Sequence, residues 1–467
     1  MLDTRSLTPP EHAPRLKRCS YIHRVDAKKG AGQTFANLTT RQLIDVPSDK
    51  LQDFEFVLSN PNSLDSFSFP QWIIRSALQN YGFLIPEQKN EINDLEKRFW
   101  AEKRDSSKFS IGIILTKKCN LRCIYCNQEH RGSLFTKSDE SKVEKLFQRE
   151  AKNLKNFSVT WWGGEPLLRL DAIERMSDYF ISVCEDHNIN YSAFTSTNGV
   201  LITEDVAKKL QNLKFKQFQI SIDGPASVHD LQRPLASGAG TSDAVIAGLS
   251  NISQVFEPNV ETVSLRIHST KIASAPHDEW LEFLDRIIPF KDHITLHFNA
   301  AYESFRFAKE NTLSHQEMLD RLSGVIAEAR ARGFRFATEN ILNNHSLMHC
   351  GAVSDRSWFV LPGGRITRCN TTFDDPQNDC GRILDDGRLE LYEAADRWVS
   401  FSPFKYDECT ECDVLPVCMG GCNIVDFSDS SGARCQLKQS IRDAIAADPR
   451  AFGKKNMDCG SCDGCKS

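Results

Sequence analysis

Residues 109–126 read FSIGIILTKKCNLRCIYC, and this stretch decides how the rest of the chain is interpreted. Its first half is a run of β-branched and aromatic residues, which predicts a short strand. Directly after it come Cys119, Cys123 and Cys126 in the spacing CxxxCxxC. Three thiolates on one loop can ligate three irons of a cubane cluster and leave the fourth iron without a protein ligand. A structural zinc site would need a fourth ligand, for which His130 is the nearest histidine.

Five further runs of the same kind follow at intervals, and stretches with helical periodicity separate them. The six expected strands cover residues 109–116, 157–164, 191–198, 217–223, 263–270 and 294–301. The expected helices between them include residues 140–154, 171–184 and 203–213. Strands that alternate with helices form parallel sheets with right-handed crossovers. The pattern therefore predicts an α/β fold, a partial (β/α)6 TIM barrel over residues 106–305.

Polar residues and glycines stand where the expected strands end. The turn Gly163-Gly164-Glu165-Pro166 ends the second strand, Asn198 the third, and Ser221 and Asp223 the fourth. In a parallel barrel the carboxyl ends of all strands meet on one face, which is the face that carries chemistry. These residues are therefore expected to lie near the cysteines of residues 119–126.

The bulk properties narrow the function classes. The chain has 467 residues, a net charge of −5 and no apolar run long enough to span a bilayer, so we expect neither nucleic-acid nor membrane binding. Its first residues lack a signal-peptide pattern, which predicts a cytoplasmic protein. Disulfides are disfavoured there, so 16 cysteines need another explanation. Clustered thiolates repel one another unless metal neutralises them, whereas the isolated Cys19 and Cys184 read as buried thiols.

The motifs together resemble the radical SAM (S-adenosylmethionine) superfamily. The resemblance implies that Cys119, Cys123 and Cys126 hold a 4Fe–4S cluster whose open iron chelates SAM. It further implies that Gly163, Gly164, Glu165 and Pro166 bind the methionine amino group. Further SAM-pocket residues by this resemblance are Tyr125 against the adenine, Asn198, Ser221 and Asp223 along the strand ends, and Arg266 for the carboxylate. Alternatives are an exposed strand arginine for Arg266 and a turn former before Gly-Pro for Asp223.

A second cysteine group resembles the SPASM domain, a two-cluster extension of peptide-modifying radical SAM enzymes. The resemblance implies two auxiliary 4Fe–4S clusters. The outer cluster would use Cys409, Cys412, Cys418 and Cys435, and the inner cluster Cys350, Cys369 and Cys422. Cys380 falls where the pattern requires no cysteine, so a spare buried thiol is favoured over a ligand. Cys459, Cys462 and Cys465 depart from the pattern and indicate either metal binding or an oxidisable tail.

The expected domain organisation has six parts. They are a flexible arm (1–18), an N-terminal α+β module (19–105), the barrel (106–305), a bridging helical segment (306–349), the cysteine-rich SPASM domain (350–445) and a cysteine-rich tail (446–467). The N-terminal module resembles leader-peptide-binding modules of peptide maturases, although a purely structural cap is an alternative. The cysteine-rich segment shows little periodicity, so we expect it to bury little apolar surface and to depend on metal.

These parts predict a peptide maturase. The resemblance implies that it cleaves SAM to a 5′-deoxyadenosyl radical and removes hydrogen from a ribosomally made precursor peptide, forming a cross-link or an oxidised side chain. A low-potential donor of the flavodoxin or ferredoxin type would supply the electron. The string DGPASVHDLQR (223–233) resembles peptide-maturing enzymes, although a polar loop with an internal Asp–Arg pair would read the same way.

Two other functions stay open. One is an anaerobic sulfatase-maturing, formylglycine-generating enzyme. That group has an aspartate close after its Gly-x4-Cys cysteine, and here only the displaced Asp374 and Asp375 follow Cys369, as weak candidates for a catalytic role. The other is a non-catalytic iron–sulfur scaffold that binds a peptide, which retention of the Gly-Gly-Glu-Pro turn disfavours.

Overall fold

The structure is a computed structural model. It describes residues 13–25, 32–259, 262–301, 307–337, 346–348 and 350–422, together with residues 438, 441, 442 and 445. The chain divides into two compact units. Unit 1 takes residues 1–102, 338–350 and 402–467, and unit 2 takes residues 103–337 and 351–401.

Unit 2 is built on one sheet whose strand order is β12-β11-β10-β9-β8-β7-β6-β13-β14-β15-β16. The strands that pair in parallel are β6 (Lys108–Thr116), β7 (Asn156–Gly163), β8 (Asn190–Thr197), β9 (Phe215–Ser221), β10 (Val263–Ser269), β11 (Ile294–Ala300), β12 (Arg335–Phe336) and β13 (Ser357–Val360). All six predicted strands are present within two residues of their expected ends. The predicted partial barrel is confirmed.

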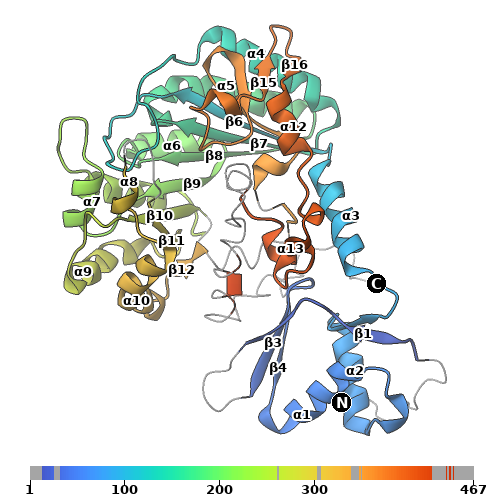
Figure 1. The fold of residues 1–467 in the computed structure, drawn as a ribbon. Helices are drawn as coiled ribbons and strands as arrows, with labels where there is room; N and C mark the ends of the chain where they lie inside the picture. The colour runs from blue at the N-terminus through green and yellow to red at the C-terminus, as the bar shows by residue number, and fades with distance from the viewer. Residues whose placement is uncertain are drawn as a thin grey trace. The chain divides into compact units, whose positions relative to one another are not determined.

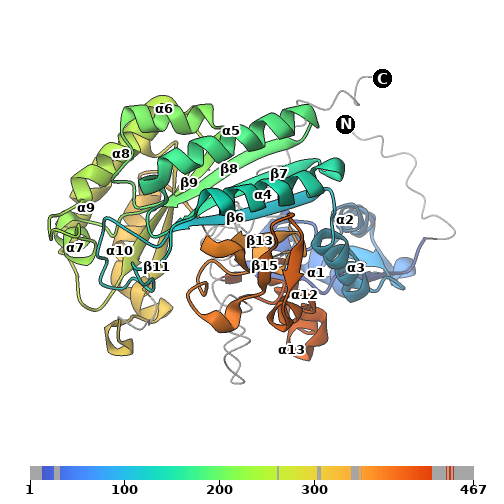
Figure 2. The ribbon, with the colours of Figure 1, turned by 90° about the horizontal axis from the view of Figure 1, so that it is seen from above.

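Helices cover the outer face of these strands (Figures 1 and 2). They are α4 (Lys137–Glu150), α5 (Leu170–Asp186), α6 (Glu204–Asn212), α8 (Ser242–Val255), α9 (His277–Ile287) and α10 (His315–Ala331), whereas the short helix α7 (Ala226–Gln232) follows the carboxyl end of β9. Under α4 and α5 the core is aromatic: Phe157 of β7 lies 4.0 Å from the ring of Phe147 and 5.2 Å from that of Phe180. Strand residues of one parity thus face the helices, and those of the other parity face the inside of the barrel.

Residues 351–401 bury more apolar surface than the sequence predicted. Strand β13 pairs with β6, and the antiparallel strands β14 (Arg365–Thr367), β15 (Gly381–Ile383) and β16 (Leu389–Leu391) extend the sheet, followed by helix α12 (Asp396–Val399). This stretch buries Val360, Leu361, Ile366, Phe373 and Trp398 almost completely. The prediction that it would bury little apolar surface was wrong, because strands of three or four residues are too short to show periodicity.

Unit 1 contains the N-terminal module and the segment that begins at Ser402. Strands β2 (Ile22–Val25), β3 (Gln33–Asn37) and β4 (Gln42–Val46) form an antiparallel sheet, and β1 (Leu16–Arg18) pairs with β5 (Leu84–Pro86). The helices of this unit are α1 (Leu51–Ser59), α2 (Phe69–Asn80), α3 (Glu91–Lys103, whose last residue begins unit 2), α13 (Asp407–Thr410) and α14 (Leu415–Cys418). No helix of the described ranges is long and apolar enough to cross a membrane.

The compact units do not follow the predicted boundaries. Residues 351–401 cluster with the barrel, whereas residues from 402 onward cluster with the N-terminal module. These two units do not test the six-part division, which stays a prediction. The tail with Cys459, Cys462 and Cys465 lies outside the described residues.

Candidate functional site

Residues 119–126, called the cysteine loop below, leave the carboxyl end of β6 and run beside residues 232–236. The amides of Arg122 and Ile124 donate to carbonyls of this segment at 2.8 and 2.9 Å, and the amide of Ala236 donates to the loop at 2.8 Å. Leu121 and Leu235 form an isolated antiparallel bridge. A segment far away in sequence therefore fixes the backbone of the loop that carries three half-buried thiols.

The turn Gly163-Gly164-Glu165-Pro166 packs against the chain that enters the cysteine loop. The amides of Gly164 and Glu165 donate to the carbonyls of Thr116 and Lys118 at 2.8 and 2.9 Å. A Cβ at Gly164 would lie 2.3 Å from the Lys118 carbonyl oxygen, and Gly163 has a φ of +134°. Glycine is required at both positions because the two backbones approach so closely.

Glu165 is wholly buried, and its carboxylate organises the neighbouring strand end. Oε1 accepts from the Leu167 amide at 3.0 Å and from the Thr197 hydroxyl at 2.8 Å, while Oε2 accepts from the Asn198 amide at 2.8 Å. Burial raises the pKa of Glu165, against these hydrogen bonds. None of the described Lys, Arg or His side chains forms a salt bridge with it. A buried carboxylate is costly unless it is hydrogen-bonded or paired, so a cation of a ligand bound beside it would stabilise its charged form.

Asn198 connects the third strand end to the cysteine loop. Its side-chain amide donates to Oδ1 of Asn120 at 2.7 Å and lies 3.8 Å from the Cys119 sulfur. The structure thus brings the predicted residues of three strand ends together, as expected when the carboxyl ends of parallel barrel strands meet on one face.

Tyr125 lies between Asp223 and Arg233. Its hydroxyl donates to Oδ2 of Asp223 at 2.7 Å and accepts from Nη1 of Arg233 at 2.7 Å. Burial raises the pKa of Tyr125, so the phenol stays protonated and able to donate. The turn-former alternative for Asp223 does not account for these contacts, because its side chain bonds across the barrel mouth.

Ser221 and Arg266 are register partners on β9 and β10, so they share a face of the sheet. Arg266 is half-buried, which disagrees with the exposed-arginine alternative. It also pairs in register with His297 of β11, whose pKa is lowered to about 3 by burial and then by the charge of Arg266. The inside of the barrel therefore carries a fixed positive charge beside a neutral imidazole.

The donor set of the cysteine loop fits a 4Fe–4S cluster. Burial raises the pKa of Cys119 to about 11 and that of Cys123 to about 12, so these thiols need a cationic partner to ionise. In the described ranges, no three His, Cys, Asp or Glu side chains converge closely enough to hold a single metal ion. A cubane does not need such convergence, since each thiolate binds a different iron. Nε2 of His130 lies 3.3 Å from the Cys126 sulfur, a hydrogen-bond contact that spacing alone did not reveal.

The cysteines of the second group are divided between the two units. Cys369 and Cys380 are buried in unit 2, whereas Cys350, Cys409, Cys412, Cys418 and Cys422 belong to unit 1. Cys435 lies outside the described residues. The Cys380 thiol points to the carbonyls of Asn378 and Ala394 at 3.5 and 3.9 Å, and burial raises its pKa. These contacts favour the spare-thiol interpretation of Cys380. The described cysteines form no disulfide.

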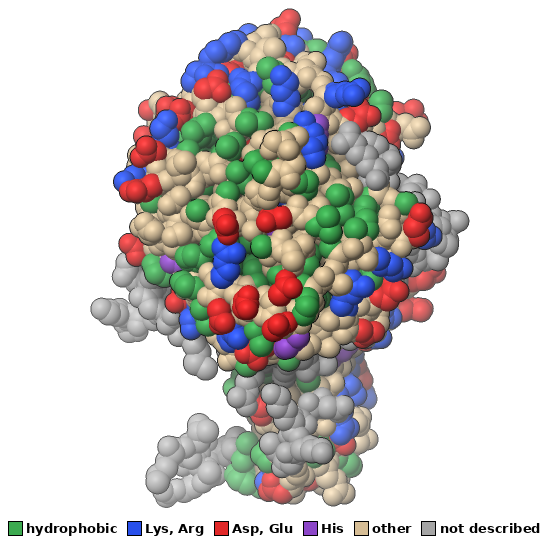
Figure 3. Space-filling view, turned by 90° about the vertical axis from the view of Figure 1, so that its left-hand side faces the viewer, with side chains coloured by type: hydrophobic (Ala, Val, Ile, Leu, Met, Phe, Trp, Pro, Cys, Tyr) green, Lys and Arg blue, Asp and Glu red, His purple; other side chains and the backbone are tan. Residues whose placement is uncertain are grey.

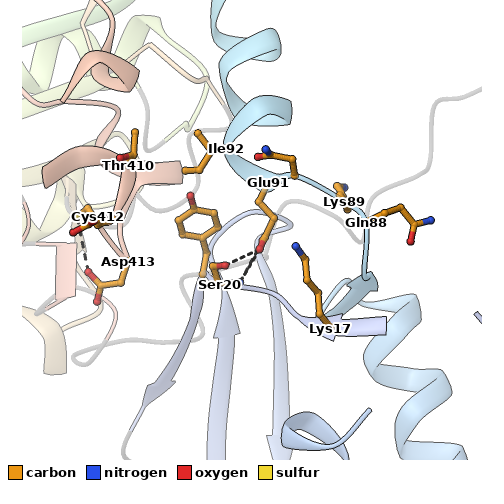
Figure 4. A pocket seen from close by; sticks show the side chains of 12 residues that line it. Lys17, Ser20, Gln88, Lys89, Glu91, Ile92, Thr410, Cys412 and Asp413 are labelled. Atoms are coloured by element: carbon orange, nitrogen blue, oxygen red, sulfur yellow. Dashed lines mark hydrogen bonds between the residues drawn. The ribbon is translucent and has the colours of Figure 1, made fainter. Parts of the chain in front are cut away.

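Cys412 lines a pocket of unit 1 with a volume of about 680 Å³ (Figure 4). One wall is the start of α3, where Glu91 accepts from the amide and hydroxyl of Ser20 at 3.0 and 2.7 Å. Asp413 lies on another wall and forms a salt bridge of 2.7 Å with Arg442. The turn that carries Cys412 is thus reachable from this pocket.

Asp374 and Asp375 are both occupied by structural contacts. Asp374 forms an ion pair with Lys117, just before the cysteine loop, and accepts from the Glu129 amide at 3.3 Å. Asp375 accepts from the amide of Gln377 and the side chain of Asn378 at 3.0 and 3.1 Å. A carboxylate paired with an ammonium group is a poor general base, and the Asp375 carboxylate caps the turn that follows it, so the structure lends no support to a catalytic role for either.

The face of the molecule drawn in Figure 3 intersperses acidic and basic side chains among apolar ones. It carries no broad surface of one charge sign among its described residues.

Comparisons with known proteins agree with this geometry. Residues 113–269 match the family model of the radical SAM superfamily. An uncharacterized protein of Methanocaldococcus jannaschii is 34% identical over 140 residues, which are 29% of this chain and 45% of that protein. The mycofactocin maturase MftC of Mycolicibacterium smegmatis is 25% identical over 343 residues, 67% of this chain and 77% of that protein. The chain thus spans less than half of the first of these relatives.

Among solved structures, native anSMEcpe with bound AdoMet and Cp18Cys peptide has a TM-score of 0.54 at 20% identity. The superposition covers 74% of this chain and 98% of that one, and it shows a shared fold. The match to the radical SAM superfamily thus covers residues 113–269, the part of the chain that carries the cysteine loop and the strand ends at the mouth of the partial barrel.

Proposed function

We propose that this protein is a radical SAM enzyme, a maturase that modifies a ribosomally made peptide or protein. One observation carries the proposal: the cysteine loop, the buried carboxylate of Glu165 and the amide of Asn198 meet at the mouth of a partial barrel. When bound there, a 4Fe–4S cluster with SAM would supply a 5′-deoxyadenosyl radical, which can remove hydrogen from an unactivated carbon.

The residues of this chain would then have the following tasks. Cys119, Cys123 and Cys126 would hold the cluster. Glu165 would bind the amino group of SAM, because it is a buried anion that already bonds two neighbouring segments. The remaining positioning residues for SAM would be Tyr125, Gly163, Gly164, Pro166, Asn198, Ser221, Asp223 and Arg266.

The peptide substrate is proposed from the cysteine spacing and from relatives. MftC is by name a mycofactocin maturase, and the anSMEcpe structure contains a bound peptide. The SPASM-like spacing extends the proposal to auxiliary clusters, of which the outer one would use Cys409, Cys412 and Cys418 with Cys435. The N-terminal module, whose outer strands β2 and β4 pair with no further strand of the described residues, would bind a precursor's leader by strand addition. We further propose a cytoplasmic location and a flavodoxin- or ferredoxin-type electron donor.

The test uses anaerobically reconstituted protein with dithionite, SAM and short peptides encoded beside the gene. We expect 5′-deoxyadenosine together with a peptide whose mass has changed by a whole number of hydrogens. A sulfatase peptide with a Cys or Ser target is the comparison substrate, and conversion of that peptide alone would replace maturation of a precursor by formylglycine formation.

The variant in which Cys119, Cys123 and Cys126 are all alanine is the negative control. It should lose iron and 5′-deoxyadenosine formation together. If the parent protein binds iron and peptide but never yields 5′-deoxyadenosine, the non-catalytic scaffold is the correct description.

A further inference from the structure

The string DGPASVHDLQR at residues 223–233 has no task in the proposed function beyond Asp223, yet the structure wraps it around the cysteine loop. The polar-loop alternative would pair Asp230 with Arg233, but this pair is absent from the ion pairs of the described residues. Asp230 instead accepts from the amides of Thr241 and Ser242 at 2.7 and 2.8 Å, which joins it to the start of α8. Arg233 points the other way, to the Tyr125 hydroxyl. Asp230 and Arg233 therefore bind different segments, and Arg233 lies beside the cysteine loop.

Arg233 is a buried cation whose charge reaches the cysteines. Only 7% of its surface is exposed. The carbonyls of its two neighbours, Gln232 and Pro234, accept from amides of the cysteine loop at 2.9 and 2.8 Å, and its own Nη1 donates to the Tyr125 hydroxyl of that loop at 2.7 Å. A charge buried this deeply is screened little by solvent or salt, so its effect on neighbouring groups is large.

Asp223 is the matching buried anion, and it is held in place on both oxygens. Oδ1 accepts from the His268 amide at 3.2 Å, and Oδ2 accepts from Tyr125 and from Gln232 at 2.7 and 2.9 Å. Burial alone would raise the pKa of Asp223, but the His268 side chain, whose Nδ1 lies 3.5 Å from Oδ1, and the charge of Arg233 lower it overall. Asp223 is therefore ionised at neutral pH.

His229 adds no charge to this group. Its Nδ1 accepts from the Asp223 amide at 3.0 Å, so that nitrogen is unprotonated. The Thr241 hydroxyl donates to the Arg233 carbonyl at 2.7 Å, so Nε2 of His229 must be the donor in its 2.9 Å contact with Thr241. Burial lowers the pKa of His229 to about 4, in agreement with a neutral ring. Its task is to hold the backbone that carries the two charges.

We propose that Arg233 and Asp223 are positioning residues that set the reduction potential of the cluster on the cysteine loop, in opposite directions, with the Tyr125 hydroxyl holding them at fixed places. The inference rests on the proposed cluster at Cys119, Cys123 and Cys126. Net charge and hydrogen bonding around an iron–sulfur cluster set its potential. The Arg233 cation stabilises the reduced, more negative cluster, whereas the Asp223 anion opposes reduction.

The experiment is an anaerobic redox titration of the reconstituted holoenzyme, followed by electron paramagnetic resonance of the reduced cluster, without SAM or peptide. Arg233→Gln should lower the midpoint potential and Asp223→Asn should raise it. The double variant should return close to the parent, because both charges are then absent. Arg131→Gln, which removes an exposed arginine from the stretch just after the cysteine loop, is the matched control and should shift the potential least.

A purely structural role would predict a different result. Both single variants would then lose cluster iron or shift the potential in the same direction, and either outcome overturns the proposal. If Arg233→Gln fails to assemble a cluster, Arg233→Lys should restore assembly with a potential near that of the parent, and Asp223→Asn must still show the upward shift. A parent protein without any 4Fe–4S signal would instead overturn the proposed function itself, so the two failures are distinguishable.

Discussion

The hydroxyl of Thr197 donates a 2.8 Å hydrogen bond to Oε1 of Glu165, across two strands that end at the barrel mouth. The bond shows why the acidic residue of the Gly-Gly-Glu-Pro turn is more than a turn residue. Its carboxylate holds the end of β8 in place, and its three hydrogen bonds leave one lone-pair site of the two oxygens unused.

Glu165→Gln should weaken SAM binding by roughly 10- to 100-fold, the range for losing one hydrogen bond to a charged group. The amide replaces one acceptor oxygen by a donor, so one of the three bonds to Glu165 is also lost. Equilibrium binding of SAM to the reconstituted protein measures this. Because burial raises the pKa of Glu165, the parent's affinity should fall as the pH falls toward that pKa, and the variant should lack this dependence. Exposed Glu129→Gln should bind SAM like the parent.

Gly164→Ala should reduce cluster assembly. Its Cβ would lie 2.3 Å from the Lys118 carbonyl oxygen and 2.6 Å from that of Lys117, and a backbone cannot yield as a flexible side chain can. We expect about 1–3 kcal/mol of destabilisation and a lower iron content per chain. The control is Gly324→Ala in α10, where the nearest neighbour is 3.4 Å away and alanine favours the helix. Equal iron contents in the two variants would contradict the close-approach argument.

The barrel could be predicted because each of its strands can be recognised from the residues of that strand alone. The runs that became β6 to β11 are continuous and β-rich, and motif residues mark their ends, so the strand-end rule was enough to bring Gly164, Asn198 and Asp223 together. None of this depends on knowing distant contacts.

The contacts around the cysteine loop could not be predicted in this way. Pairing of Leu121 with Leu235 joins two polar, turn-rich segments whose partner is fixed only by tertiary packing. The same applies to β13. Its residues Ser357–Val360 are a short isolated run in the sequence, and they form a strand by pairing with the edge of β6. The partners of Arg233 and Asp230 stayed open for the same reason, because closeness in sequence allows a pair that the fold does not form.

Cys380→Ala should leave the iron content unchanged. The Cys380 side chain is completely buried and points to two backbone carbonyls, so its removal should cost only about 1 kcal/mol in stability. Cys409→Ala should instead lower iron and sulfide by the content of one cluster if the outer auxiliary cluster exists. Cys184→Ala, in the buried face of α5, serves as the control for an isolated thiol. Loss of iron from Cys380→Ala would make this residue a ligand.

Lys103, the last residue of α3, binds residues 351–401 through its side chain. Its side chain is wholly buried, and Nζ donates to the carbonyls of Val353 and Trp398 at 2.6 and 3.0 Å and lies 3.3 Å from Asp355. Burial lowers the pKa of Lys103 to about 8, even though Asp355 opposes the shift. A neutral amine retains both donors to the carbonyls, so deprotonation removes the cost of the buried charge without breaking the anchor.

The free energy of unfolding should therefore depend on Lys103 in a defined pH window. Between about pH 8 and the ordinary lysine pKa of 10.5, the unfolded chain binds more protons than the folded one, so stability contributed by this residue rises with pH. Denaturant unfolding of the parent and of Lys103→Met should show a difference that grows across this window by up to roughly 3 kcal/mol. Lys108→Met, at an exposed position, should follow the parent at every pH. A parent–variant difference that stays flat from pH 8 to 10.5 would mean that Lys103 keeps its ordinary pKa and that the anchor is a simple ion pair with Asp355.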